Sequence, residues 1–325
     1  MNPGDPMNPT SPTPSAPKTL LLVDGTAVAY RSFFAVRALT APDGHPVNCL
    51  FGFVRLLAQL VAHVAPARTV VAFDGGSPAC RLALCPDYKA QRAPMPPDLR
   101  SQLPLLNEFL ALAGIPSLRL DHEEADDVLG TLASRAAADG WLVRIATADK
   151  DLMQLVSPSV TLLAQSKDLE TTDAARVRAK TGVDPSQIVE WLALVGDTAD
   201  NIPGVPGIGP KTAAALLQEH GTLAALYAAL DALPSASLRA KLADARPITD
   251  RNTALMTIDR DLPGVPPLDT LSADPDPVAL LDFYHRHGLR RFAADRLFLP
   301  ADAPTAAPPP PPPPPPPAHQ QLSLF

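Results

Sequence analysis

The sequence predicts an α/β fold with a central, mostly parallel sheet flanked by helices, joined to a second, helical lobe. In the first half of the chain, short apolar runs alternate with segments of helical periodicity, a pattern typical of buried parallel strands separated by helices. Three of these runs end in acids, at residues 20–24, 70–74 and 142–151. From about Thr181 onward the sequence is mostly helical in character, which predicts the second lobe.

The predicted elements follow the chain as strand 18–23, helix 27–35, loop 37–47, helix 48–64, strand 69–73, irregular segment 77–97, helix 98–113, a helix from the acidic stretch to Gly140, a strand from 142, short helix 149–156 and strand 160–164. Gly140 suits a helix end, since glycine readily adopts the left-handed conformation there. Asp184-Pro185-Ser186 has the capping chemistry to open a helix at 187–195.

Both ends of the chain differ in composition from the middle. Residues 1–17 hold six prolines and no apolar periodicity, which predicts a disordered leader. Ten consecutive prolines, 308–317, predict a stiff polyproline II spacer within residues 301–319. We therefore expect a leader at 1–17, an α/β domain at 18–180, a helical domain at 181–300, a linker at 301–319 and a terminal peptide at 320–325.

Composition excludes some classes of protein. The chain has 325 residues, of which 46% are hydrophobic, and lacks any run of 18 apolar residues, so we expect no membrane partner. The start of the chain does not resemble an export signal, and Cys49, Cys80 and Cys85 lack metal-binding spacing, so we expect a cytoplasmic protein with reduced thiols. The net charge of −7 does not identify a partner.

The stretch from Asp121 to Leu129 places five carboxylates within seven residues. Alone, it would be typical of a solvated first turn of a helix. The acids at the strand ends change this interpretation, because the ligand crevice of an open α/β sheet lies beyond the carboxyl ends of its strands. Seven carboxylates are expected to converge there: Asp24, Asp74, Glu124, Asp126, Asp127, Asp149 and Asp151. So many like charges require cations between them, which predicts a site for hard divalent metal ions.

The irregular segment at 77–97 carries three bases and an aromatic residue: Arg81, Tyr88, Lys89 and Arg92. Two interpretations stay open for it. It is either a solvated surface loop, or a segment whose bases hold phosphates while its aromatic ring stacks on a nucleobase.

A glycine-rich turn, Gly207-Ile208-Gly209, precedes a helix that starts with Pro210, Lys211 and Thr212. Backbone N–H groups exposed at such a turn suit a phosphate. Asp197 and Asp200, just upstream, are placed to reach back toward the carboxylate cluster. His285 and His287 are two residues apart and share no helix face, so we interpret them as surface histidines.

Taken together, these residues resemble the bacterial 5′-nuclease family, meaning the 5′→3′ exonuclease domain of DNA polymerase I and the flap endonucleases. The matching stretches cover about Lys18 to Pro300 in order: residues 22–25, Tyr30-Arg31, 73–74, 88–92, 124–127, 147–152 and 196–212. The resemblance implies a PIN-like nuclease core and a helical element of the helix–hairpin–helix type, the helix–three-turn–helix (H3TH). Because no polymerase domain follows, the chain resembles the stand-alone form of this family.

The resemblance implies a two-metal enzyme in which Mg²⁺ or Mn²⁺ activates water to cut a phosphodiester. Asp24, Asp74 and Asp126 would hold the first ion, with Glu124 beside it. Asp149, Asp151 and Asp200 would hold the second and share Asp126. Asp127 and Asp197 would bind through water. None of the acids of the second site is missing.

The resemblance also implies the contacts with DNA. Lys89 and Arg92 would bind the scissile phosphate with help from Arg81, and Tyr88 would stack on a base. The other implied DNA contacts are Tyr30, Arg31, Gly204, Gly207, Ile208, Gly209, Lys211 and Thr212. The H3TH element would grip duplex DNA and could hold K⁺ by backbone carbonyls. Residues 82–85 are more apolar than the family pattern, so the balance between exonuclease and flap endonuclease stays open.

The expected partner is therefore DNA with 5′ ends, flaps or nicks, bound by a monomer. Two alternative functions are compatible with parts of the pattern. An RNase of the PIN type would use the same acidic sheet edge but has no use for the glycine-rich turn. A non-catalytic DNA-binding module would not need the acids, which repel DNA unless they hold metal ions.

The last residues, Gln321, Leu322, Ser323, Leu324 and Phe325, resemble the short peptide by which bacterial replication and repair proteins bind the sliding clamp. A chance apolar terminus is the alternative. The polyproline spacer favours the clamp interpretation, because it would hold the peptide away from the nuclease body.

Overall fold

The computed structural model describes residues 17–166 and 168–301. The expectations for the leader before residue 17, for the proline-rich linker beyond residue 301 and for the clamp-binding peptide lie outside the described residues.

A six-stranded sheet forms the centre of the α/β part, in the order β3-β2-β1-β4-β5-β6. The strands are β1 (Thr19–Asp24), β2 (Arg68–Phe73), β3 (Ser117–Arg119), β4 (Leu142–Ala146), β5 (Val160–Leu163) and β6 (Thr171–Thr172). The first five are parallel, and β6 runs antiparallel to β5. Strand β1 lies between β2 and β4, so the strand order reverses there, which creates a crevice at its carboxyl end.

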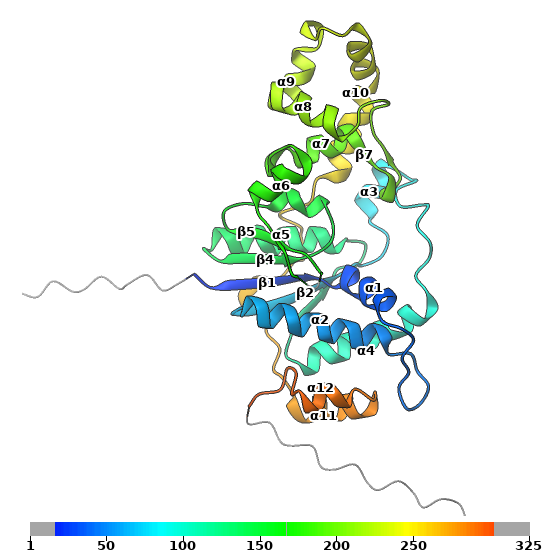
Figure 1. Ribbon diagram of the computed structural model, residues 1–325, viewed down its shortest axis with the longest axis vertical. Helices are drawn as coiled ribbons and strands as arrows, with labels where there is room; N and C mark the ends of the chain where they lie inside the picture. Colours follow the sequence, from blue (N-terminus) through cyan, green and yellow to red (C-terminus); the bar gives the residue numbers. More distant parts are fainter. Residues whose placement is uncertain (1–16, 167, 302–325) are drawn as a thin grey trace, which may run out of the picture.

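Helices cover both faces of this sheet (Figure 1). Helices α1 (Gly25–Ala35), α2 (Asn48–Val64) and α4 (Pro97–Leu112) lie on one face, and α5 (Ala125–Ala138) lies on the other. Successive side chains of a strand point to opposite faces. Accordingly Leu21 and Val23 join the core beneath α2, whereas Leu20 and Leu22 join the core beneath α5. This two-sided burial explains why β1 is apolar without alternation.

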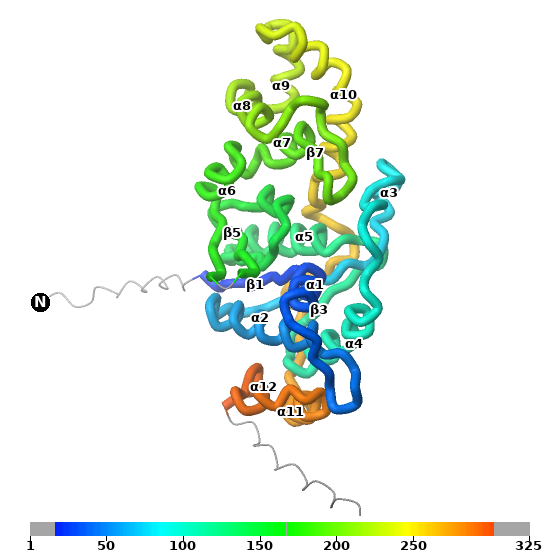
Figure 2. The backbone as a smooth tube through the Cα atoms, turned by 45° about the vertical axis from the view of Figure 1, so that its right-hand side comes forward, coloured from blue at the N-terminus to red at the C-terminus, as the bar shows by residue number. Residues whose placement is uncertain are grey.

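The helical lobe lies beyond α5 at one end of the molecule (Figure 2). It contains α7 (Ile188–Val195), α8 (Pro210–His220), α9 (Leu223–Ala228) and α10 (Ala236–Met256), and α6 (Ala174–Thr181) lies between it and the sheet. A small hairpin, β7 (Gly196–Asp197) and β8 (Ile202–Pro203), follows α7. The buried Asn252 of α10 donates to Ala193 O at 3.1 Å and Pro203 O at 2.8 Å, which fixes α10 against the hairpin.

The end of the expected helical domain, 181–300, does not lie in this lobe. After α10 the chain returns along α5, and α11 (Pro277–Arg286) and α12 (Arg290–Ala294) pack on the far side of the molecule (Figure 1). Phe283 and Tyr284 are buried in the same core as Phe109 of α4. Periodicity identifies these helices, but the apolar face of a helix does not reveal which surface it covers.

The predicted fold class is confirmed, with local corrections. The segment 77–97, expected to be irregular, contains helix α3 (Ala79–Leu84). The helix expected at 149–156 is a shorter 3₁₀ helix, Asp151–Leu155. The short strands β3 and β6 were not predicted. Gly140 has a φ of 80° just beyond α5, as expected for a helix end. Of the helices in the described ranges, none is both long enough and apolar enough to cross a membrane.

Candidate active site

Four of the expected carboxylates line one cleft at the carboxyl end of the sheet. They come from different elements: Asp24 ends β1, Asp74 follows β2, Asp126 lies in the first turn of α5, and Asp149 follows β4. The cleft has a volume of about 970 Å³. The parallel sheet thus brings together residues that are more than 120 positions apart in the chain.

Backbone and hydroxyl donors hold these acids in place. Asp24 accepts from Ala27 N at 2.9 Å, as the N-cap of α1. Asp74 accepts from Ala125 N at 2.9 Å, which joins the end of β2 to the start of α5. Thr147 Oγ1 donates to Asp24 at 3.2 Å and accepts from Asp149 N at 3.0 Å. Sequence reasoning missed Thr147, although it precedes Asp149 in the acid-ending run.

A second group of acids lies beside the first. Asp151, Asp197 and Asp200 each offer an oxygen, and these oxygens lie within 4.8 Å of one another. Asp197 and Asp200 come from the β7–β8 hairpin of the helical lobe. The expectation paired Asp149, rather than Asp197, directly with Asp151 and Asp200; in the structure Asp149 lines the cleft with Asp24.

The carboxylates of both groups repel one another and therefore favour bound cations. Burial, with added repulsion from Asp74 and Asp149, raises the pKa of Asp24 from 3.8 to about 7. Burial, with repulsion from Asp149 and Asp197, raises the pKa of Asp151 to about 8. The pKa of Asp126 is also raised, by burial and then by neighbouring carboxylates. Oδ1 of Asp151 is buried with no hydrogen-bond partner among the described residues. Oxygen ligands under this mutual repulsion suit hard divalent ions.

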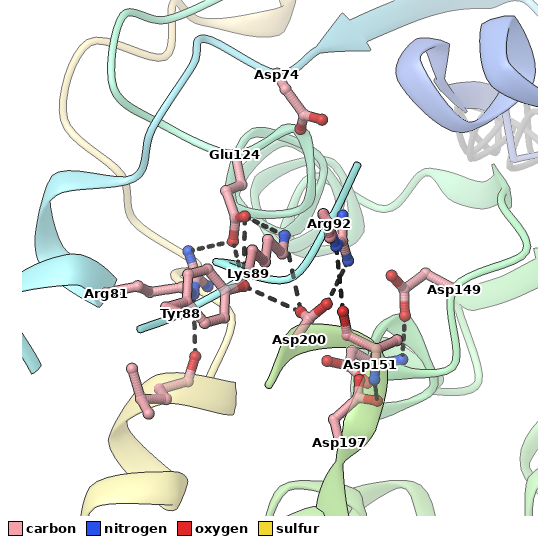
Figure 3. A network of polar contacts seen from close by, with 12 residues as sticks. Asp74, Arg81, Tyr88, Lys89, Arg92, Glu124, Asp149, Asp151, Asp197 and Asp200 are labelled. Atoms are coloured by element: carbon pink, nitrogen blue, oxygen red, sulfur yellow. Dashed lines mark hydrogen bonds and ion pairs between the residues drawn. The ribbon is translucent and has the colours of Figure 1, made fainter. Parts of the chain in front are cut away.

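Two bases of the segment after α3 lie directly over the acids (Figure 3). Lys89 pairs with Glu124, and its Nζ lies 3.7 Å from Asp200 Oδ2. Arg92 pairs with Asp200. Burial would lower the pKa of Lys89, but Glu124 and Asp200 outweigh it and raise that pKa. Lys89 is therefore held as a cation at the site.

The backbone of the same segment is tied to the lobe hairpin. Lys89 N donates to Asp200 O at 3.0 Å, and Asn201 Nδ2 donates to Asp87 O at 2.8 Å. Tyr88 is buried, with its hydroxyl 3.1 Å from Glu124 Oε2 and 3.2 Å from Asp200 Oδ2. The expected stacking of Tyr88 on a base does not fit this position, because its ring is covered by protein.

Arg81 makes a different set of contacts from the one expected. Its Nε donates to Leu255 O at 3.0 Å, its Nη2 donates to Asp127 Oδ1 at 2.9 Å, and its Nη1 lies 2.9 Å from Glu124 Oε2. Asp127 also accepts from Asp259 N at 2.8 Å. These contacts leave few donors for a phosphate and join α3, α5 and the end of α10. We infer that Arg81 and Asp127 position the site rather than bind phosphate and metal as expected.

The glycine-rich turn of the lobe faces outward. A side chain at Gly209 would meet nothing within 4 Å, and Lys211 and Thr212 are exposed. Gly207 has a φ of 78°, and Ile208 is buried beneath the turn. The other two expected DNA contacts of the α/β part lie on α1, where Tyr30 lines the cleft and Arg31 is exposed.

Two residues of the lobe were not interpreted correctly from the sequence. A side chain at Gly204 would come within 2.2 Å of Val195 O, so packing requires this glycine, and we assign it no DNA contact. The ammonium of Lys241, from α10, lies beside Gly207, where an added Cβ would be 2.9 Å from it. Sequence reasoning missed Lys241, because nothing in the helical pattern of α10 relates it to a turn 34 positions earlier.

Two family models match the chain, and each covers one of the two parts that contribute to this site. Residues 19–182 match the 5′-3′ exonuclease N-terminal, resolvase-like domain, and residues 183–277 match the 5′-3′ exonuclease C-terminal SAM fold. The chain belongs to the 5′-3′ exonuclease family. The boundary between the two family domains falls just before α7, so the acids of the second group come from both.

Relatives within this family include enzymes of different length. The chain is 44% identical over 206 residues to the 5′-3′ exonuclease of Aquifex aeolicus, covering 63% of this chain and 71% of the relative. It is 41% identical over 258 residues to DNA polymerase I of Bacillus caldotenax, covering 78% of this chain and 29% of the polymerase. The chain thus spans less than a third of that polymerase.

Solved structures share the fold. A T5 5′-exonuclease with divalent zinc ions bound aligns with a TM-score of 0.63 at 22% identity, covering 86% of this chain and 100% of that one. The catalytic core of Rad2 in complex with DNA substrate aligns with a TM-score of 0.56 at 22% identity, covering 82% and 87%. At these identities the likeness concerns the arrangement of elements.

The contacts of Arg81 predict a large effect on stability. Arg81→Gln should lower the free energy of unfolding by about 3 kcal/mol, because it leaves buried Asp127 without its cation and removes one of the two cations that face Glu124. Arg92→Gln should cost less than about 1 kcal/mol, because the Arg92 side chain is 49% exposed, against 11% for Arg81. Urea unfolding measures both, and equal losses would contradict the positioning role of Arg81.

The raised carboxylate pKa values predict how metal and pH act on stability. Since the folded-state pKa of Asp151 lies above its unfolded value, its ionisation destabilises the folded state as the pH rises from about 4 to about 8. With a chelator present, Asp151→Asn should therefore gain stability relative to the parent as the pH rises through this window. If this group holds a divalent ion, excess Mg²⁺ at about pH 8 should reverse the order of stability, because the parent would offer one more charged ligand than the variant. Urea unfolding of both proteins tests this prediction. A difference in the free energy of unfolding that does not change with pH would contradict it.

Proposed function

We propose that this protein is a metal-dependent DNA 5′-nuclease that hydrolyses phosphodiesters at 5′ ends, flaps or nicks. The observation that carries the proposal is the meeting of two acid groups beneath Lys89 and Arg92. One lies at the edge of the sheet, and the other combines Asp151 with two acids of the lobe hairpin. Metal ligands and phosphate-binding bases thereby share one site that is connected to the outward-facing turn of the lobe.

The two acid groups are proposed to hold two divalent ions, Mg²⁺ or Mn²⁺. When bound, such ions supply a hydroxide nucleophile near neutral pH and neutralise charge on the leaving oxygen. Asp24, Asp74 and Asp126 would hold one ion, and Asp151, Asp197 and Asp200 the other. Asp149 lies between the groups, since one of its oxygens accepts from Asp151 N at 2.8 Å.

The bases act on the phosphate. Lys89 and Arg92 lie over the acids and would bind the non-bridging oxygens of the scissile phosphate, where negative charge builds up during the reaction. Glu124 holds Lys89 and lies against Tyr88 and Arg81, so it would orient the base over the site.

The turn before α8 is proposed to hold duplex DNA. Gly207, Gly209, Lys211 and Thr212 are exposed at the start of an 11-residue helix, where a helix N-terminus suits a phosphate. A K⁺ ion held by carbonyls of the turn would add positive charge there. An RNase that acts on single strands would have no use for this lobe, which makes DNA the favoured substrate.

The protein would act in the cytoplasm as a monomer. A bacterial sliding clamp is the proposed second partner, on the sequence of the terminal peptide alone, since that peptide lies outside the described residues. Tethering to a clamp would raise the local concentration of the nuclease at nicks and flaps.

Cleavage of a labelled 5′-flap DNA and of a matching RNA hairpin, with Mg²⁺ or with a chelator, tests the proposed function. The parent should cut the DNA only with Mg²⁺. Asp151→Asn should lower the rate by at least about a hundredfold and leave DNA binding largely intact, because it removes a ligand and a negative charge together. Preferential cutting of the RNA would indicate the PIN-type RNase, and metal-dependent binding without cutting would indicate a non-catalytic module.

Gly209→Val tests the turn. Its φ of −92° accepts any side chain and its surroundings are open, so the variant should fold with unchanged stability. Duplex affinity should fall, because the valine occupies space that a phosphate needs. Lys211→Glu should also weaken binding and reduce the slope of log affinity against log salt by about one. Duplex affinities and salt slopes equal to those of the parent in both variants would exclude the turn from the DNA interface.

Deletion of residues 321–325 tests the clamp. A pull-down should show loss of clamp binding, while cleavage of free oligonucleotides is unchanged because the acid groups are intact. A Leu324→Ala, Phe325→Ala double variant is the matched control, since it keeps the length of the tail. It should lose clamp binding as well. Equal clamp retention by all forms would refute this partner.

A further inference from the structure

The cleft that holds the first acid group continues past it, along α4. Beyond Asp24 and Asp74 its wall is partly apolar and partly basic. The apolar part is made by Tyr30, Phe73, Met95, Leu103 and Pro104, and the polar part by Arg100, Asn107 and Arg119. Neither the acid groups nor the lobe turn accounts for this extension.

Two guanidinium groups in the extension have no acidic partner. No carboxylate of residues 17–166 and 168–301 lies within ion-pair distance of Arg100 or Arg119, whereas Arg81, Lys89 and Arg92 are each paired with an acid. Arg119 is oriented by one bond, from Nε to Asp74 O at 3.0 Å, which leaves its terminal N–H groups available. Both side chains are exposed to the cleft. Cations facing an open cleft without acidic partners suit an anionic ligand.

The position of the extension indicates which anion. Helix α4 lies on the opposite side of the sheet from α7–α10 (Figures 1 and 2). If the lobe holds duplex DNA, a strand that leaves the duplex and crosses the acid groups continues toward α4. In a 5′-nuclease the part of the strand beyond the cut, on the side away from the duplex, is its 5′ part. The extension is therefore placed for the nucleotides that are released.

We propose that Arg100 and Arg119 bind backbone phosphates of the nucleotides on the 5′ side of the cut, while the apolar wall at Met95, Leu103 and Pro104 contacts their sugars and bases. This inference rests on the proposed nuclease function and adds a subsite to it. The subsite provides affinity for flaps and helps to set the cut position, because it holds the strand on the side opposite the duplex. Arginine suits this role, since its planar fork of donors matches two phosphate oxygens.

Phosphates neutralised one at a time give a direct test. Flap DNAs are made with an uncharged methylphosphonate at the first, second or third linkage on the 5′ side of the cut. Each is assayed for kcat/KM with the parent, Arg100→Gln, Arg119→Gln and the control Arg55→Gln, which removes an exposed arginine of α2 outside the cleft. Arg100 makes no side-chain hydrogen bond to the described residues, so its loss is a clean test even if Arg119→Gln disturbs Asp74.

The expected result is coupling. Either cleft variant should cut the unmodified flap about tenfold less efficiently, as for one lost charge-assisted hydrogen bond. One methylphosphonate position should cost the parent and Arg55→Gln a similar factor but cost the cleft variant nothing further. Additive losses at every position, or flap cleavage by Arg100→Gln at the parent rate, would overturn the subsite. Failure of the parent to cut any flap DNA would instead overturn the proposed function itself, and the subsite with it.

Discussion

Electrostatic repulsion among buried carboxylates is the constraint on which this site depends. The sheet brings Asp24, Asp126 and Asp149 together at its carboxyl end, and the lobe hairpin adds Asp200. Burial and mutual repulsion raise the pKa of Asp24, Asp126 and Asp151, so the folded chain holds these acids in the ionised form only with positive charge nearby. The bases of the segment after α3, and divalent ions as proposed, supply that charge.

Arg81 in α3 and the two bases of the following segment have different roles, because their surroundings differ. Arg81 is the least exposed and is bound to two acids and a carbonyl, which suits a permanent connection between α3, α5 and α10. Arg92 is half exposed and reaches the site from the solvent side. Lys89 lies between them, with a single charged atom near both Glu124 and Asp200. A bidentate guanidinium suits a fixed joint, whereas a flexible ammonium suits a group that changes partner.

Sequence reasoning was most successful where one local pattern determines the answer. The buried strands and the acids at their ends followed from apolar runs, and α2 begins and ends at the predicted residues because its apolar face is continuous. It failed where the answer depends on a contact made across the fold. The partners of Arg81, the burial of Tyr88 and the packing need for Gly204 are all tertiary. The location of α11 and α12 was missed for the same reason, because an apolar helix face fits more than one surface.

The β7–β8 hairpin belongs to the C-terminal family domain, yet it carries Asp197 and Asp200 into a group completed by Asp151 of the N-terminal one. The same hairpin binds the backbone of Lys89 and Asp87. Neither domain could therefore keep the second acid group or the position of its bases if the two were separated. In evolutionary terms, the two halves form one heritable unit: a recombination event that exchanged the lobe would have to preserve the hairpin, its two aspartates and its backbone contacts together.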